Sequence, residues 1–545
     1  MRQVCANVRL VEATSKDTFR DKTRSRKTTF AALVGACVTV FVFGLYVRTL
    51  APSVLYYERP ILLDSVMYQV QAIVLGNTGP TGEPSWTMLT HLFTYLPFGD
   101  PGYRVNLASA VYGALAVAAL YAAGWLLSRR TAAAAAGALA FGLGRSFWSQ
   151  AVIAEIYTLN ALLILLPVIT LLVWRERRQD RYLLLASFLM GFAMTNHMTS
   201  GLVIPASFLF VFLVDRRKLL DLGLVLKGVG LFLLGLTPYL YLPIRASMDP
   251  PINEANPTNL GRFWELVSGG GQQELLFQFG PAELPTRVML YAEYLFRDFN
   301  LFLLMVALAG VAFLFFRDRA VAVFTGFLYL GWLFHALEYN IFDVELYFIP
   351  TYLMLCLWMT VGSGALLETA EDAVAGSREV VRRATVFATS ALVVLLPLAG
   401  VWHTYKKNDM SDAYEGRETI EAVVENVEKG ATVLHHRSEL WYMVLVEKRR
   451  QDLTLIDPWP PGRSRYTDIV WPDDIGLVTT NLRYGTNDST GVSTAKEAAE
   501  DGPVYILEQE SAGSHNFYDA GFRTERVEGE LFELIPPGRE HNAKE

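Results

Sequence analysis

The chain has 545 residues, of which 52% are hydrophobic and 19% are charged, and its formal net charge is -7. A soluble protein usually carries about a quarter charged residues, so this balance argues against an ordinary soluble enzyme and indicates a membrane protein. The net charge gives no support for nucleic-acid binding, and an odd cysteine count with Cys37 and Cys356 in apolar segments argues against a disulfide framework.

Eleven apolar segments approach the roughly 20 residues that a helix needs to cross a bilayer. One follows the basic start of the chain, six come after a first polar gap, and four come after a second gap. They are 30–47; 105–127, 132–147, 151–174, 182–195, 199–214 and 222–242; 301–316, 320–337, 346–366 and 384–403. The sequence therefore predicts a polytopic α-helical membrane protein with about eleven transmembrane helices. The pair 182–195 and 199–214 is short, and a hairpin that only half enters the bilayer is the alternative.

Lysine and arginine are concentrated in alternate loops. They crowd the segment before the first span and recur at 129–130, 175–181, 215–218, 317–319 and 378–383. By the positive-inside rule these loops are cytoplasmic, and the first span is retained because no cleavage signal follows it. The prediction is an integral protein of the plasma membrane with a cytoplasmic N-terminal segment (1–29), a transmembrane domain (30–403) with external loops 48–104 and 243–300, and a soluble extracytoplasmic domain (404–545).

The first external loop holds a carboxylate beside the membrane. Asp64 precedes an amphipathic stretch ending at Leu75, a Gly- and Pro-rich turn covers 76–84, and a second stretch runs from Trp86 to Phe98. Neither stretch is long enough to cross, so both are predicted as short helices in the interface. Asp64 could be a general base for an acceptor arriving from water, or it could simply cap the following helix, and the residue types favour the cap.

Other polar residues gather at the same outer level of the membrane. Burying such groups is costly, so their clustering indicates a functional site at the outer leaflet. Arg245 suits an anionic phosphate because its guanidinium can fork onto two oxygens, and a snorkelling anchor is the equally weighted alternative. The cluster comprises Glu155, Tyr157, Asn196, His197, Arg245 and Asp343.

Several short motifs occur in an order and spacing that resemble one family. They are Asp64-Ser65, LPFGDPGYRVNLASA at 96–110, SFWSQA at 146–151, EIYTLN at 155–160, NHMT at 196–199 and YLPIRA at 241–246, with a weaker echo at 339–350. The chain resembles a family of GT-C-type membrane glycosyltransferases, formerly of unknown function, that includes the eukaryotic transmembrane protein O-mannosyltransferases.

This resemblance implies a GT-C-like fold and transfer of a mannose-like sugar from a polyprenyl-phosphate carrier to a protein or glycan acceptor at the outer membrane face. Asp64 matches the family's catalytic carboxylate, and as a base in an in-line attack it would invert the anomeric centre. Glu155 is the second catalytic candidate. Arg245, His197 and Arg104 are the candidates for binding the donor phosphate.

The chain departs from the family pattern in two places. The family usually continues Asp-Ser-Gly-Glu, whereas Val66 and Met67 follow here, and its His-Pro-Pro-Gly-Tyr-Pro turn is replaced by GPTGEP at 79–84. Glu83 or His91 could substitute for the missing histidine. Two other functions therefore stay open: a transporter or flippase for a lipid-linked substrate, and an inactive family member acting in assembly. No metal ligands or cofactor are predicted, and a need for a divalent metal is left open.

The last part of the chain has the pattern of a small α/β domain. Helical spacing covers 413–428 and 439–447, and short strands are predicted at 432–434, 453–456, 504–507 and 531–535. The domain has no phosphate-binding glycine loop and no metal-ligand spacing. We expect it to bind the acceptor or to pack against the membrane domain.

Overall fold

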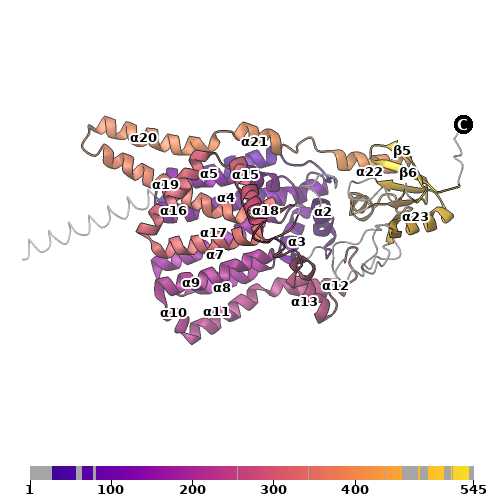
Figure 1. The fold of residues 1–545 in the computed structure, drawn as a ribbon, viewed down its shortest axis with the longest axis horizontal. Helices are drawn as coiled ribbons and strands as arrows, with labels where there is room; N and C mark the ends of the chain where they lie inside the picture. Colours follow the sequence, from indigo (N-terminus) through magenta and orange to yellow (C-terminus); the bar gives the residue numbers. More distant parts are fainter. Residues whose placement is uncertain are drawn as a thin grey trace, which may run out of the picture.

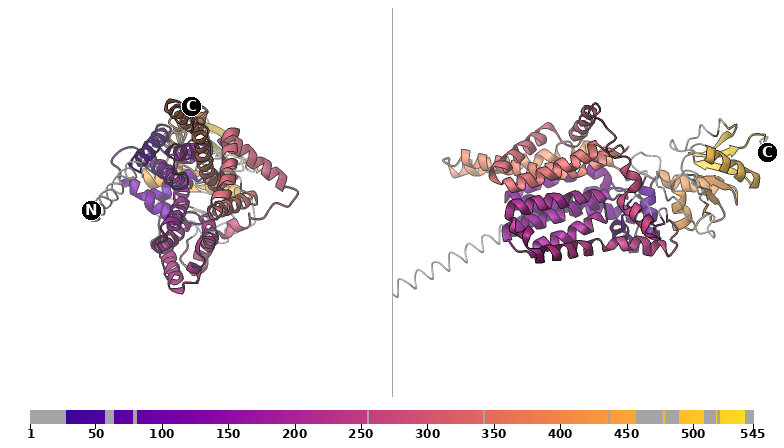
Figure 2. Two further views of the ribbon diagram at one scale, coloured as in Figure 1. Left: turned by 90° about the vertical axis from the view of Figure 1, so that its left-hand side faces the viewer. Right: turned by 60° about the horizontal axis from the view of Figure 1, so that its bottom comes forward.

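The computed structural model describes residues 28–56, 64–77, 81–253, 256–341, 343–435, 437–456, 477–478, 489–507, 517 and 520–538. Its long helices run side by side in one bundle, and the small C-terminal domain projects from one end of that bundle (Figure 1). Two further views show the same separation of a helical body and a terminal α/β domain (Figure 2). The basic segment predicted to be cytoplasmic lies, up to residue 27, outside the described residues.

Within the described residues, eight helices are long and apolar enough to cross a membrane. They are Thr28–Arg48, α4 (Pro101–Ser128), α7 (Tyr157–Arg177), η2 with α9 (Met198–Asp215), α11 through α12 (Leu222–Ala246), α17 (Arg319–Leu337), α19 (Ile349–Ala373) and α20 through α21 (Glu379–Asn408). A ninth is α15 (Leu284–Asp298) with α16 (Leu301–Arg317), if this pair, bent by 108°, counts as one span. The predicted polytopic α-helical class is confirmed.

The predicted number of eleven spans is not confirmed. The other two predicted segments are helical, but α5 (Thr131–Gly142) has 12 residues and α8 (Arg181–Met194) has 14. At 1.5 Å per residue these helices are about 18 and 21 Å long, well short of a hydrocarbon core of about 30 Å. The sequence criterion of roughly 20 apolar residues counted these segments as spans because it measures apolar length and does not detect where a helix ends.

Close contacts between glycines and facing backbones bring several helices together. A Cβ atom on Gly310 of α16 would collide with the main chain at Trp358 of α19, and one on Gly362 of α19 would collide with the carbonyl of Val306. The same reciprocal arrangement joins α8 to α11 through Gly191 and Gly235. Small residues are used in this way because lipid tails provide no hydrophobic force between helices, so close packing must hold them.

Gly310→Leu is therefore expected to destabilise the bundle. The new side chain has no space at the α16–α19 contact, and overpacking typically costs about 1–3 kcal/mol and sometimes more. We expect a clearly lower thermal midpoint in detergent. Gly326→Leu on α17 is the matched control, because a Cβ there meets nothing within 4 Å. Equal midpoints for the two variants would contradict the packing argument.

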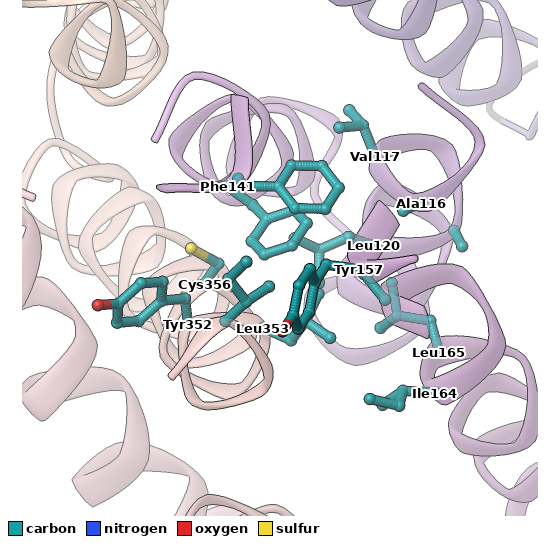
Figure 3. Close-up of a cluster of buried hydrophobic side chains, with 14 of the residues drawn as sticks. Ala116, Val117, Leu120, Phe141, Tyr157, Ile164, Leu165, Tyr352, Leu353 and Cys356 are labelled. Atoms are coloured by element: carbon teal, nitrogen blue, oxygen red, sulfur yellow. The ribbon is translucent and has the colours of Figure 1, made fainter. Parts of the chain in front are cut away.

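Large apolar side chains fill the centre of the bundle. Leu120 of α4, Phe141 of α5, Leu165 of α7 and Leu353 of α19 converge in one buried cluster (Figure 3). Cys356 lies in the same region as a buried free cysteine. This core fixes the helices whose outer ends carry the polar residues discussed below.

The first external gap forms short helices at one end of the bundle. α2 (Ser65–Val74) has 10 residues, α3 (Pro84–His91) has 8, and the 3-10 helix η1 (Leu92–Tyr95) continues α3. All are too short to cross a bilayer, as predicted. They lie at the end of the bundle from which the C-terminal domain extends (Figure 1). Residues 78–80 of the predicted Gly- and Pro-rich turn lie outside the described residues.

The C-terminal domain contains a sheet whose described strands are ordered β3-β2-β1-β4-β6-β5. β1 is parallel to both β2 and β4, and β6 is antiparallel to β4 and β5. The strands are β1 (Thr432–Leu434), β2 (Thr454–Ile456), β3 (Leu477–Val478), β4 (Val504–Leu507), β5 (Arg523–Glu528) and β6 (Leu531–Ile535), and helices α22 (Glu415–Asn426) and α23 (Ser489–Asp501) complete the unit. The predicted small α/β domain is confirmed.

The sequence patterns did not predict two of these strands, β3 and β5, and they did not distinguish the helix type of the segment predicted at 439–447. β5 is a polar edge strand with mostly exposed side chains, so it carries no hydrophobic alternation to detect. β3 has only two residues. The helix predicted at 439–447 includes a π-helical segment, Tyr442–Val446, and its wider turn is invisible to a 3.6-residue period.

The C-terminal domain is joined tightly to α2 and to the start of α4. Asp100, the N-cap of α4, accepts hydrogen bonds from the hydroxyl of Tyr442 (2.8 Å) and the guanidinium of Arg417 (3.0 Å). A Cβ on Gly416 would collide with the carbonyl of Leu55, so the main chains of the two domains are in direct contact. Apolar residues of α2 and α22 share one core. These contacts therefore hold the C-terminal domain against α2 and the start of α4, the elements near Asp64.

Candidate active site

Asp64 lies immediately before α2, at the bundle end that faces the C-terminal domain. It occupies the N-cap position, but its side chain makes no capping hydrogen bond and 47% of that side chain is exposed. α2 itself is fixed by the buried Gln69, which accepts from the N–H of Leu55 and donates to Asn106. The helix thus holds the Asp64 carboxylate at the surface without using it as a cap, which removes the main support for the capping alternative.

Glu155 is buried beside α2. Its Oε1 accepts a hydrogen bond from the hydroxyl of Ser65 (2.7 Å), while Ser109 and Trp86 bond to its main chain. Burial raises the pKa of the Glu155 carboxyl well above its usual value, the hydrogen bond from Ser65 opposes this in part, and the charge of Asp64 adds a smaller upward effect. Burial therefore favours the protonated form of Glu155, and these contacts hold the residue in place.

Asp343 adds a third carboxyl group from a distant part of the chain. It precedes α18 (Val344–Tyr347), the hydroxyl of Tyr157 donates to its Oδ2 (3.4 Å), and its buried Oδ1 has no hydrogen-bond partner among the described residues. Burial raises the pKa of Asp343 to about 7, and the charge of Asp64 is the second cause. Because Glu155 and Asp343 both respond to the charge of Asp64, the fold brings together three carboxyl groups that are far apart in the sequence.

Aromatic rings line this cluster on the bundle side. The ring of Tyr157 lies 5.8 Å from that of His197 and 6.1 Å from that of Tyr347, and His197 lies 5.7 Å from Tyr347. Thr199 donates to Nδ1 of His197 through its backbone N–H. Burial lowers the pKa of His197 to about 3, so the imidazole is neutral. It can hydrogen-bond to a phosphate but adds no positive charge.

The two arginines predicted to bind phosphate both support the backbone. Arg245 donates from Nε to the carbonyl of Leu75 (2.6 Å) and from Nη2 to that of Val74, at the end of α2 opposite to Asp64. Arg104 donates to carbonyls at Thr94, Phe98 and Gly99 and so fixes the turn before α4. α2 is about 15 Å long, which separates Arg245 from Asp64. A phosphate contact for either arginine stays a prediction.

The remaining sequence candidates lie around α3 and the turn after α8. Glu83 is buried at the start of α3, where Thr81 donates to its carboxylate, and its φ of 34° is left-handed. His91 bonds to the carbonyl of Ala72 and to the hydroxyl of Tyr95, and so links α3 to α2. Asn196 donates weakly to the carbonyl of Ile156, next to Glu155. This contact joins Asn196 to the chain segment that carries Glu155.

One functional candidate was missed in the sequence. Arg437 of the C-terminal domain places Nη1 3.7 Å from Oδ1 of Asp64. No motif marks this arginine, because the two residues are separated by most of the chain and by a domain boundary. In the part of the chain that the structure describes, no group of three or more His, Cys, Asp or Glu side chains could hold a metal ion.

A family model described as the protein O-mannosyl-transferase TMEM260 N-terminal domain matches residues 64–220, which begin at Asp64. Protein O-mannosyl-transferase TMEM260 of Mus musculus is 31% identical over 181 residues, covering 32% of this chain and 26% of the mouse protein. Protein O-mannosyl-transferase tmem260 of Dictyostelium discoideum is 23% identical over 316 residues, covering 52% of this chain and 36% of that protein. The matches thus span about a quarter to a third of these relatives.

The fold is similar to that of ArnT, a GT-C enzyme. The crystal structure of ArnT from Cupriavidus metallidurans bound to undecaprenyl phosphate has a TM-score of 0.56 at 11% identity, covering 92% of this chain and 97% of ArnT. The apo structure of the same enzyme has a TM-score of 0.51. The GT-C-like fold and the resemblance to the O-mannosyltransferase family, both predicted from the sequence, are confirmed.

Proposed function

We propose that this protein is an inverting glycosyltransferase that moves a mannose-like sugar from a polyprenyl-phosphate carrier to a hydroxyl of a protein or glycan acceptor. The observation that carries the proposal is Asp64, a half-exposed carboxylate that lies near the two buried carboxyl groups of Glu155 and Asp343 at the end of a GT-C-like bundle. The names of the relatives support a mannosyl donor and a protein acceptor. The lipid bound in the ArnT structure supports a polyprenyl phosphate.

In the proposed reaction Asp64 is the general base. The acceptor hydroxyl loses its proton to the Asp64 carboxylate as its oxygen attacks the anomeric carbon of the sugar. The bond from that carbon to the carrier's phosphate oxygen breaks on the opposite face, and the phosphate leaves with the electron pair. Attack and departure on opposite faces invert the anomeric centre. Glu155, whose protonated form is favoured by burial, lies beside Ser65 and bounds the site.

The proposed orientation has the N-terminus in the cytoplasm and the C-terminal domain outside the cell membrane. Arg217 and Lys218 of α10 (Arg217–Leu220) lie at the bundle end opposite to α12, α13 (Leu260–Ser268) and the C-terminal domain (Figure 1). Basic loops prefer the cytoplasmic side, so this polarity supports an external active site. An acceptor would then reach Asp64 from water while the lipid carrier arrives from the outer leaflet.

The direct test is transfer by the purified full-length protein. A radiolabelled polyprenyl-phosphate mannose and a peptide containing serine and threonine are supplied in detergent, and label in the peptide is counted. We expect transfer, with the anomeric configuration of the product opposite to that of the donor. Free mannose phosphate without the lipid is the control and should give none. The proposal would be refuted if the protein does not bind the lipid donor and does not transfer its sugar. The same measurement is made with other sugars on the same carrier.

A further inference from the structure

The segment that follows β1 lies at the position where open α/β sheets usually bind ligands. β1 lies between β2 and β4: the chain first adds β2 and β3 on one side of β1, and it later adds β4 on the other side. At such a switch point the crevice outside the carboxyl ends of the strands is the usual binding position. His435, Arg437 and Glu439 follow the carboxyl end of β1. In this protein that end of the sheet is turned toward Asp64.

Arg437 is held there by an unusual backbone. Its φ of 42° is in the left-handed region, which non-glycine residues rarely adopt and which costs free energy. The side chain is 16% exposed and reaches the half-exposed carboxylate of Asp64 at 3.7 Å. The contacts of Asp100 with Arg417 and Tyr442 keep the two domains in register around this pair.

Besides Arg437, three described titratable groups interact with the charge of Asp64, and each of them is an acid that supplies no positive charge. Glu155 comes from the loop before α7, Asp343 from the loop before α18, and Tyr68 from α2 itself. Burial is the main cause that raises the pKa of each of these three groups, and the charge of Asp64 adds to it. By reciprocity, any negative charge on them disfavours ionisation of Asp64. A base must be ionised to accept a proton, so a cation beside Asp64 directly favours the reactive form.

We infer that Arg437 is a positioning residue which keeps Asp64 ionised and directed, so that the C-terminal domain completes the active site. This inference rests on the proposed role of Asp64 as base. A role in binding the donor phosphate fits the geometry less well. In an in-line attack the base and the leaving phosphate lie on opposite sides of the anomeric carbon, and Arg437 lies on the side of the base.

The test compares rate–pH profiles of the full-length protein with polyprenyl-phosphate mannose and a serine/threonine peptide. For Arg437→Gln we expect the acidic limb of the kcat profile to move up by about one pH unit, so that kcat at a pH on that limb falls about tenfold, because an opposite charge within about 4 Å favours the ionised form. KM for the donor should stay within about twofold of the parent. Arg437→Lys, which retains the charge, should restore the acidic limb.

Arg526→Gln is the matched control, since it removes an exposed arginine from β5 of the same domain. Its profile should superimpose on that of the parent. An unshifted acidic limb in Arg437→Gln overturns the inference, and a raised donor KM with an unshifted limb assigns Arg437 to the phosphate instead. If Arg437→Gln does not fold, Arg437→Met and Arg437→Lys are compared, and equal limbs in these two overturn it. An active Asp64→Asn protein would instead remove the role of Asp64 as base, on which this inference rests, whereas a parent protein that transfers no sugar would remove the proposed function.

Discussion

Asp64→Asn is expected to lower the turnover of sugar transfer by about 100- to 10,000-fold, because positioned proton transfer contributes about this much to a rate. Donor binding should change little, since the carrier's phosphate leaves on the far side of the anomeric carbon. The measurement is single-turnover transfer together with equilibrium binding of the polyprenyl-phosphate sugar. A large loss of turnover at unchanged donor affinity is the signature of a lost base and not of a lost binding contact.

Asp221→Asn is the matched control for this substitution. Asp221 is the N-cap of α11, and its side chain accepts a hydrogen bond from the N–H of Leu224. Asn caps helices about as well as Asp, so this variant should be silent in folding and in transfer. Near-normal transfer by a well-folded Asp64→Asn protein would end the base hypothesis. Asp343, with a pKa raised to about 7, would then be the next carboxylate to test, ahead of Glu155, whose pKa burial raises well above its usual value.

Asp343→Asn is expected to stabilise the protein at alkaline pH. The pKa of this carboxyl rises on folding from 3.8 to about 7, so the folded state binds its proton more tightly than the unfolded state. The stabilisation from this proton is complete below about pH 4 and is lost as pH rises to 7, where the buried group ionises. At 1.36 kcal/mol per pKa unit the upper limit of this loss is roughly 4 kcal/mol.

Thermal midpoints of parent and variant, measured in detergent from pH 5 to pH 8.5, check this expectation. The parent should lose stability relative to Asp343→Asn as pH rises, because an amide does not ionise. The gap should be smallest near pH 5, where Asp343 is largely protonated. Asp221→Asn again serves as a control and should show a constant offset. A gap that is the same at every pH would contradict the assignment of a raised pKa to Asp343.

Much of this protein was determined by local sequence. The eleven apolar segments all form helices, because a stretch without water-accessible polar groups must satisfy its backbone internally. Strands β1, β4 and β6 were found at their predicted bounds, since their apolar residues form the buried core of the sheet. Asp64 became the candidate base because a carboxylate next to an apolar helix is unusual and because its motif resembles the O-mannosyltransferase family, and this role stays a prediction.

Tertiary structure decided what the polar residues do. Sequence patterns could not show that Arg245 and Arg104 would donate to carbonyls of neighbouring turns, because a guanidinium binds a backbone oxygen and a phosphate oxygen by the same hydrogen bonds. The proximity of Asp343 to Glu155 depends on how α7 and α18 pack. The pairing of Arg437 with Asp64 depends on the docking of a separate domain. Local patterns report burial and periodicity, whereas these contacts join residues far apart in the chain, and only the packed fold brings their charges close enough to interact.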